Sequence, residues 1–336
     1  MTYPTYPVAL PPKQPGRYGN RPTPRAFVFA SDPQYPWTPA SDYGEYESDA
    51  DRNKASQALI NEQYASIASY RDSLGGTGIP VMINGDMTAY GHGWQRKVLY
   101  PIIERHLQEN YYFGLGNHDY RNNVTDESGG SFNNGGPRDS VIDLIDHHRG
   151  LVDTMDVATS GSYKQTSYSG SLGYSISFGR VRLIQLNNEP TYRVDFDSGW
   201  AWPFEHRHKF RVSDALGWLE GQLEEAYENG QIILLNLHQP DDWDGTEEDL
   251  MHFRDMINHF QVNAVFGGHH HTAAGGWYRS NRQYGVVPVF LSGSASQRTY
   301  LLAELDNDAQ GLTVKCVRNN DWTQAETLRH LRLYRA

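Results

Sequence analysis

The feature that most constrains the fold is a repeated pattern of short apolar segments separated by longer polar, helix-like stretches. "AFVFASDPQ" (26–34) and "IPVMINGDM" (79–87) each predict a buried strand running into a polar turn, with a helix expected at 52–73 between them. This order is a βαβ unit, which predicts an α/β fold. The pattern continues with two helices and one strand, expected at 94–109, 139–149 and in "YYFGLGNHD" (111–119).

The second half of the chain repeats the alternation. A hairpin is expected in "YSISFGRVRLIQLNN" (174–188), followed by a helix at 212–230 with Ser213 as its N-cap. The next elements are a buried strand in "QIILLNLHQP" (231–240), a helix near 246–260 and a strand at 262–266. Two further strand-like segments follow at 287–295 and 299–306, before "GLTVKCVRN" (311–319) and a charged end.

The composition changes along the chain. Residues 1–25 hold seven of the seventeen prolines, which predicts an extended arm over the surface or a disordered tail. The length of 336 residues allows one elaborated α/β domain or two small ones, and we expect a single domain over 26–336. Within it, 120–173 is rich in Gly, Ser, Asn and Tyr, which favours a loop-rich insertion over the site.

Charge and hydropathy exclude several partners. A formal net charge of −11 disfavours a nucleic-acid binder and tight adsorption to anionic membranes, while transient contact with a membrane surface stays compatible with it. No segment approaches the roughly 18 apolar residues of a membrane span, and 1–25 lacks the apolar core of a signal peptide. We expect a cytoplasmic protein or an exported one whose signal has been removed. The single Cys316 excludes an internal disulfide framework and leaves the compartment and the oligomeric state open.

Five predicted strand ends carry residue types that bind metals: "SDPQ", "NGDM", "GNHD", "LHQP" and "GGHHHT". Each alone is also explained by a turn or a helix cap, and a histidine triplet in a loop is commonly only solvated. Strands of an open α/β sheet place ligands at their carboxyl ends, so the five together indicate one site. Gly267 and Gly268 are expected to let the backbone turn sharply before the triplet. A mixed set of oxygen and nitrogen ligands suits two hard or borderline divalent ions.

The ordered series D-x-[HQ], G-D, G-N-H-D, H and G-H-x-H resembles the calcineurin-like metallophosphoesterase superfamily over most of residues 26–305. The resemblance implies a four-layer αββα sandwich, with two mixed sheets flanked by helices. It also implies two divalent ions, which could be Mn, Fe, Zn, Mg or Ca. Carried over position by position, one ion takes Asp32, Gln34, Asp86 and His271, and the other takes Asp86, Asn117, His238 and His269. Asp86 would bridge the ions, and His270 would point away.

Such a set of ligands favours anionic esters. The charge of two divalent ions exceeds that of Asp32 and Asp86, and a bound phosphate and a bridging hydroxide would neutralise the remainder. Ions roughly 3.5–4 Å apart can hold a deprotonated water and clamp the phosphoryl oxygens for in-line attack on phosphorus. His118 is expected to donate a proton to the departing oxygen, with Asp119 orienting its imidazole.

Gln34 stands where the family more commonly has a histidine. Its amide oxygen should favour harder ions such as Mn, Mg or Ca over Zn. The alternative interpretation is that Gln34 only hydrogen-bonds a water bound to the ion.

Aromatic and basic residues crowd the predicted rim of the site. They either pack or form a platform for a ring or an apolar group of the substrate. "DSGWAWPFEHRHKFR" (197–211) adds groups that could meet a second phosphate, a sugar-like headgroup or a membrane interface. The residues considered for substrate contact are Tyr35, Trp37, His92, Tyr120, Trp200, Trp202, His206 and Arg207.

The sequence therefore predicts a metal-dependent phosphoric ester hydrolase, and specifically a phosphodiesterase. Phospholipid headgroup diesters such as phosphatidylinositol, cleaved as by a phospholipase C, are the expected substrates, alongside other small diesters such as cyclic nucleotides. A phosphomonoesterase of the same fold is the alternative within enzymes. A non-catalytic binding scaffold is the alternative of another class, and the complete ligand series with His118 argues against it.

Overall fold

The computed structural model describes residues 21–125, 132–199, 206–277 and 281–333. The predicted helices are present, with ends shifted by a few residues. Within the described ranges the α-helices are α1 (Pro39–Asp42), α2 (Asp49–Leu74), α3 (Gly93–Leu107), α4 (Gly135–His148), α5 (Leu216–Glu228), α6 (Glu247–His259) and α7 (Asn281–Tyr284). Short 3₁₀ turns lie at η1 (Gly76–Gly78), η2 (Arg121–Asn123), η3 (Phe132–Asn134) and η4 (Trp322–Gln324).

The strands form two large sheets and one small sheet. The six-stranded sheet has the order β17 (Glu326–Arg332), β16 (Gly311–Val317), β15 (Tyr300–Leu305), β1 (Ala26–Ala30), β2 (Val81–Ile83) and β3 (Tyr111–Phe113). The seven-stranded sheet has the order β13 (Gly275–Trp277), β14 (Val289–Leu291), β12 (Ala264–Gly267), β11 (Ile232–Asn236), β8 (Val181–Gln185), β7 (Tyr174–Phe178) and β4 (Thr154–Met155). The small sheet contains β5 (Ala158–Ser162), β6 (Gln165–Gly170), β10 (Arg207–Val212) and β9 (Val194–Ser198).

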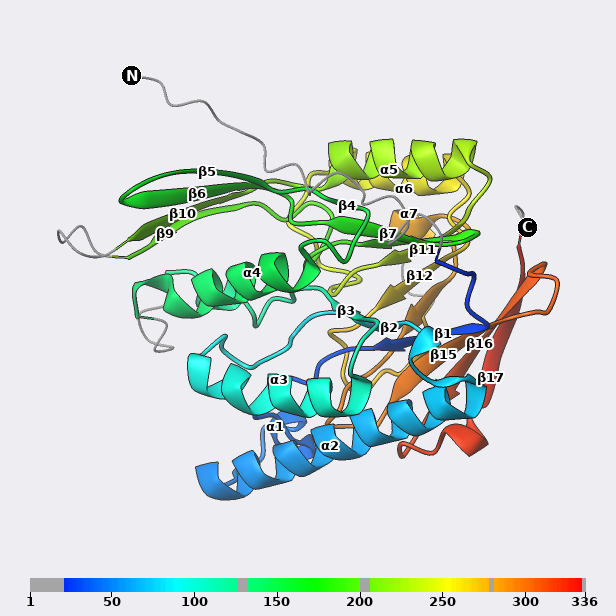
Figure 1. Cartoon of the computed structure of the whole chain (residues 1–336), viewed down its shortest axis with the longest axis horizontal. Helices are drawn as coiled ribbons and strands as arrows, with labels where there is room; N and C mark the ends of the chain where they lie inside the picture. Colours follow the sequence, from blue (N-terminus) through cyan, green and yellow to red (C-terminus); the bar gives the residue numbers. More distant parts are fainter. Residues whose placement is uncertain (1–20, 126–131, 200–205, 278–280, 334–336) are drawn as a thin grey trace.

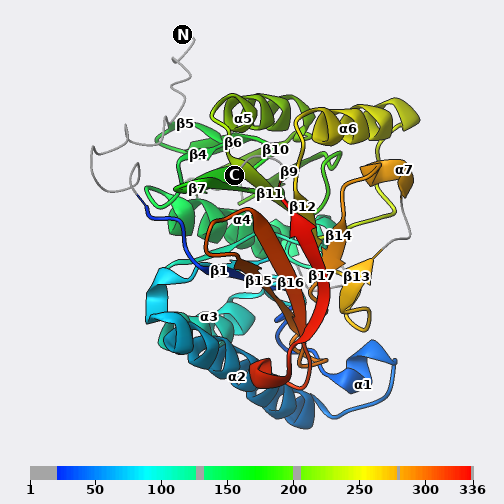
Figure 2. The same ribbon diagram turned by 90° about the vertical axis from the view of Figure 1, so that its right-hand side faces the viewer.

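The two large sheets pack face to face, and helices cover both outer faces. Figure 2 shows the layers in order from α5 and α6, through the seven-stranded and the six-stranded sheets, to α3 and α2. At the centre, Phe29 of β1 stacks on Phe266 of β12, with ring centroids 3.6 Å apart. Both sheets mix parallel and antiparallel strands. The predicted αββα sandwich is confirmed.

The central strands are apolar along their whole length because both of their faces are buried. In β11, Ile232 and Leu234 belong to the core between the sheets, while Ile233 and Leu235 belong to the core under α5 and α6. Successive side chains of a strand point to opposite faces, so a strand covered on both sides needs a continuous apolar run. This explains why runs such as "IILL" predict the strands correctly.

The parallel strands direct their carboxyl ends to one edge of the sandwich. β1, β2 and β3 are parallel neighbours in one sheet, and β8, β11, β12 and β14 are parallel neighbours in the other. Since the two sheets face each other, the loops after β1, β2, β3, β11 and β12 meet at that edge. These loops carry the five predicted motifs.

Segment 120–173, expected to be a loop-rich insertion with a helix at 139–149, also contains strands. It contains α4, β4, β5 and β6; β5 pairs with β6, and β6 pairs with β10 in the small sheet beside α4 (Figure 1). β5 and β6 are mostly half-exposed, so their Ser, Thr and Tyr residues lack the apolar alternation that marks a strand with one buried face. Pairing gives these residues their β structure: β5 pairs with its neighbour β6, and β6 also pairs with the distant β10.

Two smaller differences also have local causes. Ser213 is not the N-cap of α5: the helix begins at Leu216, and the carboxylate of Asp214 accepts the Leu216 N–H at 3.1 Å, which supplies the acceptor from a position closer to the helix. β17 has a charged, largely exposed sequence, "ETLRHLR", and pairs only with β16 at the sheet edge. Edge strands commonly carry charged side chains, so such a segment gives no apolar signal.

Of the N-terminal arm, residues 1–20 lie outside the described part of the chain. Arg21 follows directly and anchors the chain to the seven-stranded sheet. Its guanidinium pairs with Asp153 at 3.0 Å and donates to the Leu151 carbonyl at 2.6 Å.

Candidate active site

The loops after β1 and β2 are tied together by their backbones. The Asp32 N–H donates to the Gly85 carbonyl at 3.1 Å, and the Gln34 N–H donates to the Asp86 carbonyl at 2.9 Å. The loop after β12 joins them because the His269 N–H donates to the Asp32 carboxylate at 3.0 Å. The motif loops therefore form one connected unit.

Several predicted ligands have a left-handed backbone. Asp32, Gln34, Asp86 and His269 have φ values of 51°, 35°, 49° and 69°. Such a conformation costs a non-glycine residue about 1–3 kcal/mol and is concentrated at functional sites. The strain aims side chains from different loops at a common point instead of along their strands.

The glycines around the histidine triplet serve close approach and not a sharp turn. Neither Gly267 nor Gly268 has a positive φ, and His269 makes the left-handed turn itself. A Cβ atom on Gly268 would overlap the Ser31 hydroxyl and lie 2.6 Å from the Asp32 carboxylate. The predicted role of these glycines is corrected: Gly268 lets the loops after β1 and β12 touch.

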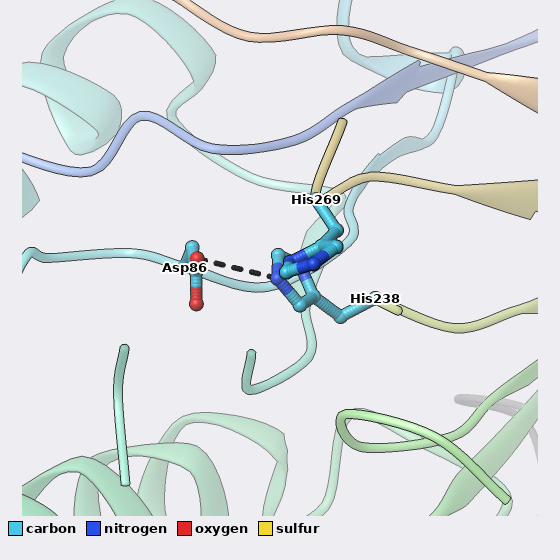
Figure 3. Close-up of side chains that lie close together, drawn as sticks. All are labelled: Asp86, His238 and His269. Atoms are coloured by element: carbon cyan, nitrogen blue, oxygen red, sulfur yellow. Dashed lines mark ion pairs between the residues drawn. The ribbon is translucent and has the colours of Figure 1, made fainter. Parts of the chain in front are cut away.

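Two groups of side chains have the spacing of metal ligands, and they share Asp86. The first is Asp32, Asp86 and His271, and the second is Asp86, His238 and His269; the ligand atoms within each group all lie within 4.8 Å of one another. Figure 3 shows the rings of His238 and His269 meeting the carboxylate of Asp86, with the ion pair to His238 dashed. The grouping matches the two predicted sets, with Asp86 in both.

Asn117 completes the second group. Its amide oxygen lies 3.0 Å from His238 Nε2 and 3.0 Å from His269 Nδ1. His238 Nε2 lies 3.2 Å from the Asp86 carboxylate. On its other side, His238 Nδ1 donates to the Asn84 carbonyl at 2.7 Å, which fixes the tautomer that turns Nε2 to the site.

Gln34 is buried beside the first group. It is fully buried, and neither polar atom of its side-chain amide has a hydrogen-bond partner among the described residues. A buried amide without a partner costs about 1–3 kcal/mol, so a cation or a water at its oxygen would relieve this cost. Asp32 and Asp86 are buried nearby with no Lys or Arg bound to any predicted ligand in the described ranges.

The carboxylates dominate the electrostatics of the histidines. Burial alone lowers the pKa of His238, but Asp86 and Asp32 outweigh it and raise that pKa to about 9. The pKa of His271 rises to about 10, against burial, because Asp32 and a further carboxylate, Asp42, flank it. Burial and the charge of His238 lower the pKa of His269 to about 4. The buried carboxylates thus favour positive charge at His238 and His271.

The donor set fits divalent metal ions. Carboxylate oxygens, amide oxygens and imidazole nitrogens together suit hard or borderline cations, and the unpartnered Gln34 amide and the paired buried carboxylates favour a cation in their midst. Asp32, Gln34, Asp86 and His271 would hold one ion, and Asp86, Asn117, His238 and His269 the other.

His118 lies at the rim with its ring fixed by a backbone group. Its Nδ1 donates to the Ala89 carbonyl at 3.0 Å, and its backbone N–H donates to Asp86 at 2.8 Å. The predicted orienting role of Asp119 is therefore wrong. Asp119 is buried and accepts the N–H groups of Met87, Thr88 and Gly116 at 3.0–3.1 Å, while burial and nearby Asp86 raise its pKa to about 7. Asp119 thus joins the loops after β2 and β3.

The residues predicted to contact substrate fall into three places. Trp37 is at the site, with its ring centroid 5.5 Å from that of His118 and 5.9 Å from that of His271. Tyr35 is buried with its ring edge against Trp94, and His92 caps α3 and lies near Tyr90. Tyr120 is fully buried against Tyr192, so its predicted contact with substrate is corrected to core packing.

The remaining predicted contacts come from 197–211. His206 bonds Thr166, and Arg207 pairs with Asp197, all within the small sheet. None of these bonds reaches a predicted metal ligand. Trp200 and Trp202 lie outside the described residues. The middle histidine of the triplet, His270, turns from the cluster to Asp241, 2.9 Å away, in agreement with its predicted orientation.

Sequence reasoning missed Asp42, the last residue of α1. Its side chain is only 3% exposed and lies 2.5 Å from His271 Nδ1. "TPASDYG" contains a helix-capping threonine and an Asp like many others, so the sequence has no signal that singles it out. The backbone acceptors Ala89 and Asn84 were also missed, because a carbonyl group carries no residue identity.

The fold and the site together define an α/β sandwich domain with two candidate metal-ligand groups at one edge of its sheets. Similarity to a solved structure titled "GAP50 the anchor in the inner membrane complex of Plasmodium" covers 92% of this chain and 88% of that chain, with 12% identity and a TM-score of 0.43. No match is found among curated proteins. Residues 27–273 match the family model of the calcineurin-like phosphoesterases, and the chain belongs to this family.

Membership of this family makes the protein, in general terms, a metal-dependent phosphoester hydrolase. Its substrate is accordingly a phosphate ester. In the described part of the chain, none of the helices combines the length and the apolar character needed to cross a membrane.

Proposed function

We propose that the protein is a phosphodiesterase that uses two divalent ions held by the two ligand groups around Asp86. When bound, such ions polarise the phosphoryl oxygens and lower the pKa of a water that attacks phosphorus. The protein's own residues position the ester, hold the loops together and supply the proton that the leaving oxygen needs. The four predicted ligands of each ion are those given for the candidate active site. The loop after β3, which carries the ligand Asn117, also carries the proposed proton donor His118.

His118 is the proposed proton donor. Because Nδ1 is engaged by the Ala89 carbonyl, the ring presents Nε2 to the ester. In its protonated form the ring can pass the Nε2 proton to the departing oxygen. The indole of Trp37, edge-on to the His118 ring, limits the orientations of the ring and forms one wall for the ester substituent.

The observation that carries the preference for a diester is that, in the described part of the chain, no predicted ligand is paired with a basic side chain; Arg121 bonds Gln239 beside His238, and not a ligand. Among the described residues, no Lys or Arg is paired with Asp32, Asp86 or any other predicted ligand. A monoester dianion carries one more negative charge than a diester and is commonly bound by such groups. Buried Asp42 adds a further negative charge beside the first ligand group, which disfavours the dianion again.

A phospholipid headgroup diester is the proposed substrate class. Exposed aromatic side chains flank the motif loops: Tyr43 follows Asp42 directly, and Tyr90 and Trp94 follow the loop after β2, with exposures of 66%, 41% and 49%. Tyr and Trp side chains favour the boundary between water and lipid because one end is apolar and the other polar. A soluble diester does not need such residues.

The test compares bis-p-nitrophenyl phosphate with p-nitrophenyl phosphate on protein stripped by chelation and reloaded with Mn²⁺. Both release the same leaving group, so the comparison isolates the second substituent. We expect kcat/KM to favour the diester at least about tenfold, which corresponds to about 1.4 kcal/mol. The Asp86→Ala variant measures the background rate.

Other results would identify the alternatives. A preference of the same size for the monoester would make the protein a phosphomonoesterase. Metal binding without turnover of either ester would make it a binding scaffold. Phosphatidylinositol vesicles and a water-soluble diester of the same headgroup then separate the substrate classes. Faster release of headgroup from vesicles supports the phospholipid, and equal rates contradict it.

A further inference from the structure

Helix α1 places one carboxylate behind the first ligand group. Asp42, its last residue, accepts four hydrogen bonds from three other segments of the chain. Its Oδ1 accepts from His271 Nδ1 at 2.5 Å and from the Trp37 indole N–H at 2.7 Å, while its Oδ2 accepts from Ser296 Oγ and Gln297 Nε2, each at 2.6 Å. The Asp42 carboxylate is 3% exposed and accepts four hydrogen bonds, so its position and orientation are fixed by the surrounding structure.

We propose that Asp42 is a positioning residue that fixes the tautomer and the ring orientation of His271 for metal binding. This inference rests on the proposed function, because it takes His271 as a ligand of the first ion. Asp42 is not itself a predicted ligand or substrate contact, and it acts through His271 and Trp37.

The geometry assigns different tasks to the two nitrogens of His271. Nδ1 donates to Asp42, and Nε2 lies 3.1 Å from Asp32 Oδ1 on the side of the ligand group. Nε2 must carry no proton when it binds a cation, so the single proton of the neutral ring has to reside on Nδ1. A carboxylate bonded to the other nitrogen of a histidine ligand orients the ring and increases its basicity.

The orientation of His271 depends on its Nδ1 partner, Asp42, more than the orientation of His238 depends on its own Nδ1 partner, the Asn84 carbonyl. His238 is fully buried, and the Asn84 carbonyl fixes its Nδ1. His271 lies in a turn after β12, and its side chain is 13% exposed. Besides Asp32, which would itself bind the ion, Asp42 is the only described hydrogen-bond partner of its ring. Removing Asp42 therefore leaves no described hydrogen-bond partner at Nδ1 to fix the tautomer of the ring.

The two oxygens of Asp42 allow the positioning role to be separated from a tethering role. Oδ1 serves His271 and Trp37, whereas Oδ2 ties α1 to the loop between β14 and β15. Asp42→Asn keeps the size and can keep an oxygen at the Oδ1 position but removes the charge. Ser296→Ala removes one tether at Oδ2 and leaves Oδ1 unchanged, so it is the matched control.

The first measurement is the titration of metal-free protein with Mn²⁺ by calorimetry. We expect Asp42→Asn to weaken the first ion about 10–100-fold, the range for losing such a partner, and to leave the second ion unchanged. Ser296→Ala should lower the thermal stability of the metal-free protein without changing either affinity. Wild-type affinities for both ions in Asp42→Asn would overturn the proposal, and so would equal weakening in Ser296→Ala.

The second measurement detects the proton on His271 directly and not through a metal affinity. Long-range ¹H–¹⁵N spectra of Zn²⁺-loaded wild type report which nitrogen of His271 carries the proton, and the metal-free spectrum of Asp42→Ala, which has no acceptor at the Oδ1 position, reports whether the Nδ1–H bond is lost. We expect a proton on Nδ1 in the loaded protein and loss of the bonded signal in the variant. A proton on Nε2 overturns the positioning role. If wild type binds no ion at all, the proposed function fails, while the metal-free spectra still test the Asp42 contact.

Discussion

Replacement of His118 by Ala tests the mechanism most directly because the structure separates the two functions of this residue. The side chain faces the rim and bonds the Ala89 carbonyl at 3.0 Å, whereas the backbone N–H donates to Asp86 at 2.8 Å. The substitution removes the proposed proton donor and keeps the hydrogen bond to the bridging carboxylate. The ligand groups and the metal content should therefore stay unchanged.

The magnitude depends on the leaving group. General acid catalysis by one side chain contributes roughly 10²–10⁴-fold, or about 3–5 kcal/mol, when the departing oxygen is a poorly stabilised alkoxide. p-Nitrophenolate leaves without a proton, so its diester should lose much less. Loss of the ring contact with Trp37 should affect both substrates equally, and it sets the baseline for the comparison.

The assay measures kcat/KM for an alkyl diester and a p-nitrophenyl diester in wild type and His118→Ala, with bound metal counted in each preparation. The ratio of the two losses reports the proton transfer, because changes in binding or folding cancel. Equal losses on both leaving groups would refute the role of His118 as an acid. Loss of metal in the variant would instead make the side chain a support of the ligand groups.

Asp86→Ala should be the most damaging change of a ligand, because Asp86 belongs to both groups; elemental analysis should show that both ions are lost, and retention of either ion would contradict its bridging position. Gln34→His should tighten the first ion and shift its preference from Mn²⁺ toward Zn²⁺, since imidazole is the softer ligand; unchanged affinities in competitive titrations would exclude Gln34 as a ligand. His148 is buried and neutral, with Nε2 accepting the Phe113 N–H and Nδ1 donating to the Leu144 carbonyl, and burial holds its pKa well below the usual value. The unfolded chain takes up this proton near pH 6.5 and the folded chain does not, so the free energy of unfolding should fall as the pH drops below about 6.5, by about 2 kcal/mol at pH 5. Urea unfolding at pH 7 and pH 5 measures this loss, and an equally steep loss in His148→Leu would assign it to other groups.

Much of the architecture can be predicted from the sequence for local reasons. Runs such as "AFVFA" and "IILL" predict the central strands because a strand buried on both faces must be apolar throughout. The polar turns after these strands predict the site, because parallel strands direct their carboxyl ends to one edge. Asp32, Asp86, His238 and His269 could be named together on this basis. Their order along the chain, and the resemblance it carries, then gave the two ligand groups.

Other features depend on contacts between residues that lie far apart along the chain. Asp42 and His271 are separated by 229 positions, so their pairing exists only once α1 and the loop after β12 have packed at the same edge. Asp119 follows His118 directly in the sequence, yet the turn directs its carboxylate to three backbone N–H groups. The imidazole of His118 donates to the Ala89 carbonyl instead. Tyr120 resembles a rim residue until packing buries it.

The sequence by itself determined the central sheets and the residue types that line the site. Backbone propensity and burial act locally, and they appear in the sequence as apolar runs that end in polar turns. The tertiary structure decided which neighbour each side chain faces. Hydrogen bonds to backbone groups leave no residue-specific signal in the sequence. β6 pairs with β10 of a distant segment, and β5 pairs with β6. For that reason the ligands could be read from the chain, whereas the groups that orient them, Asp42 and the Ala89 and Asn84 carbonyls, required the folded molecule.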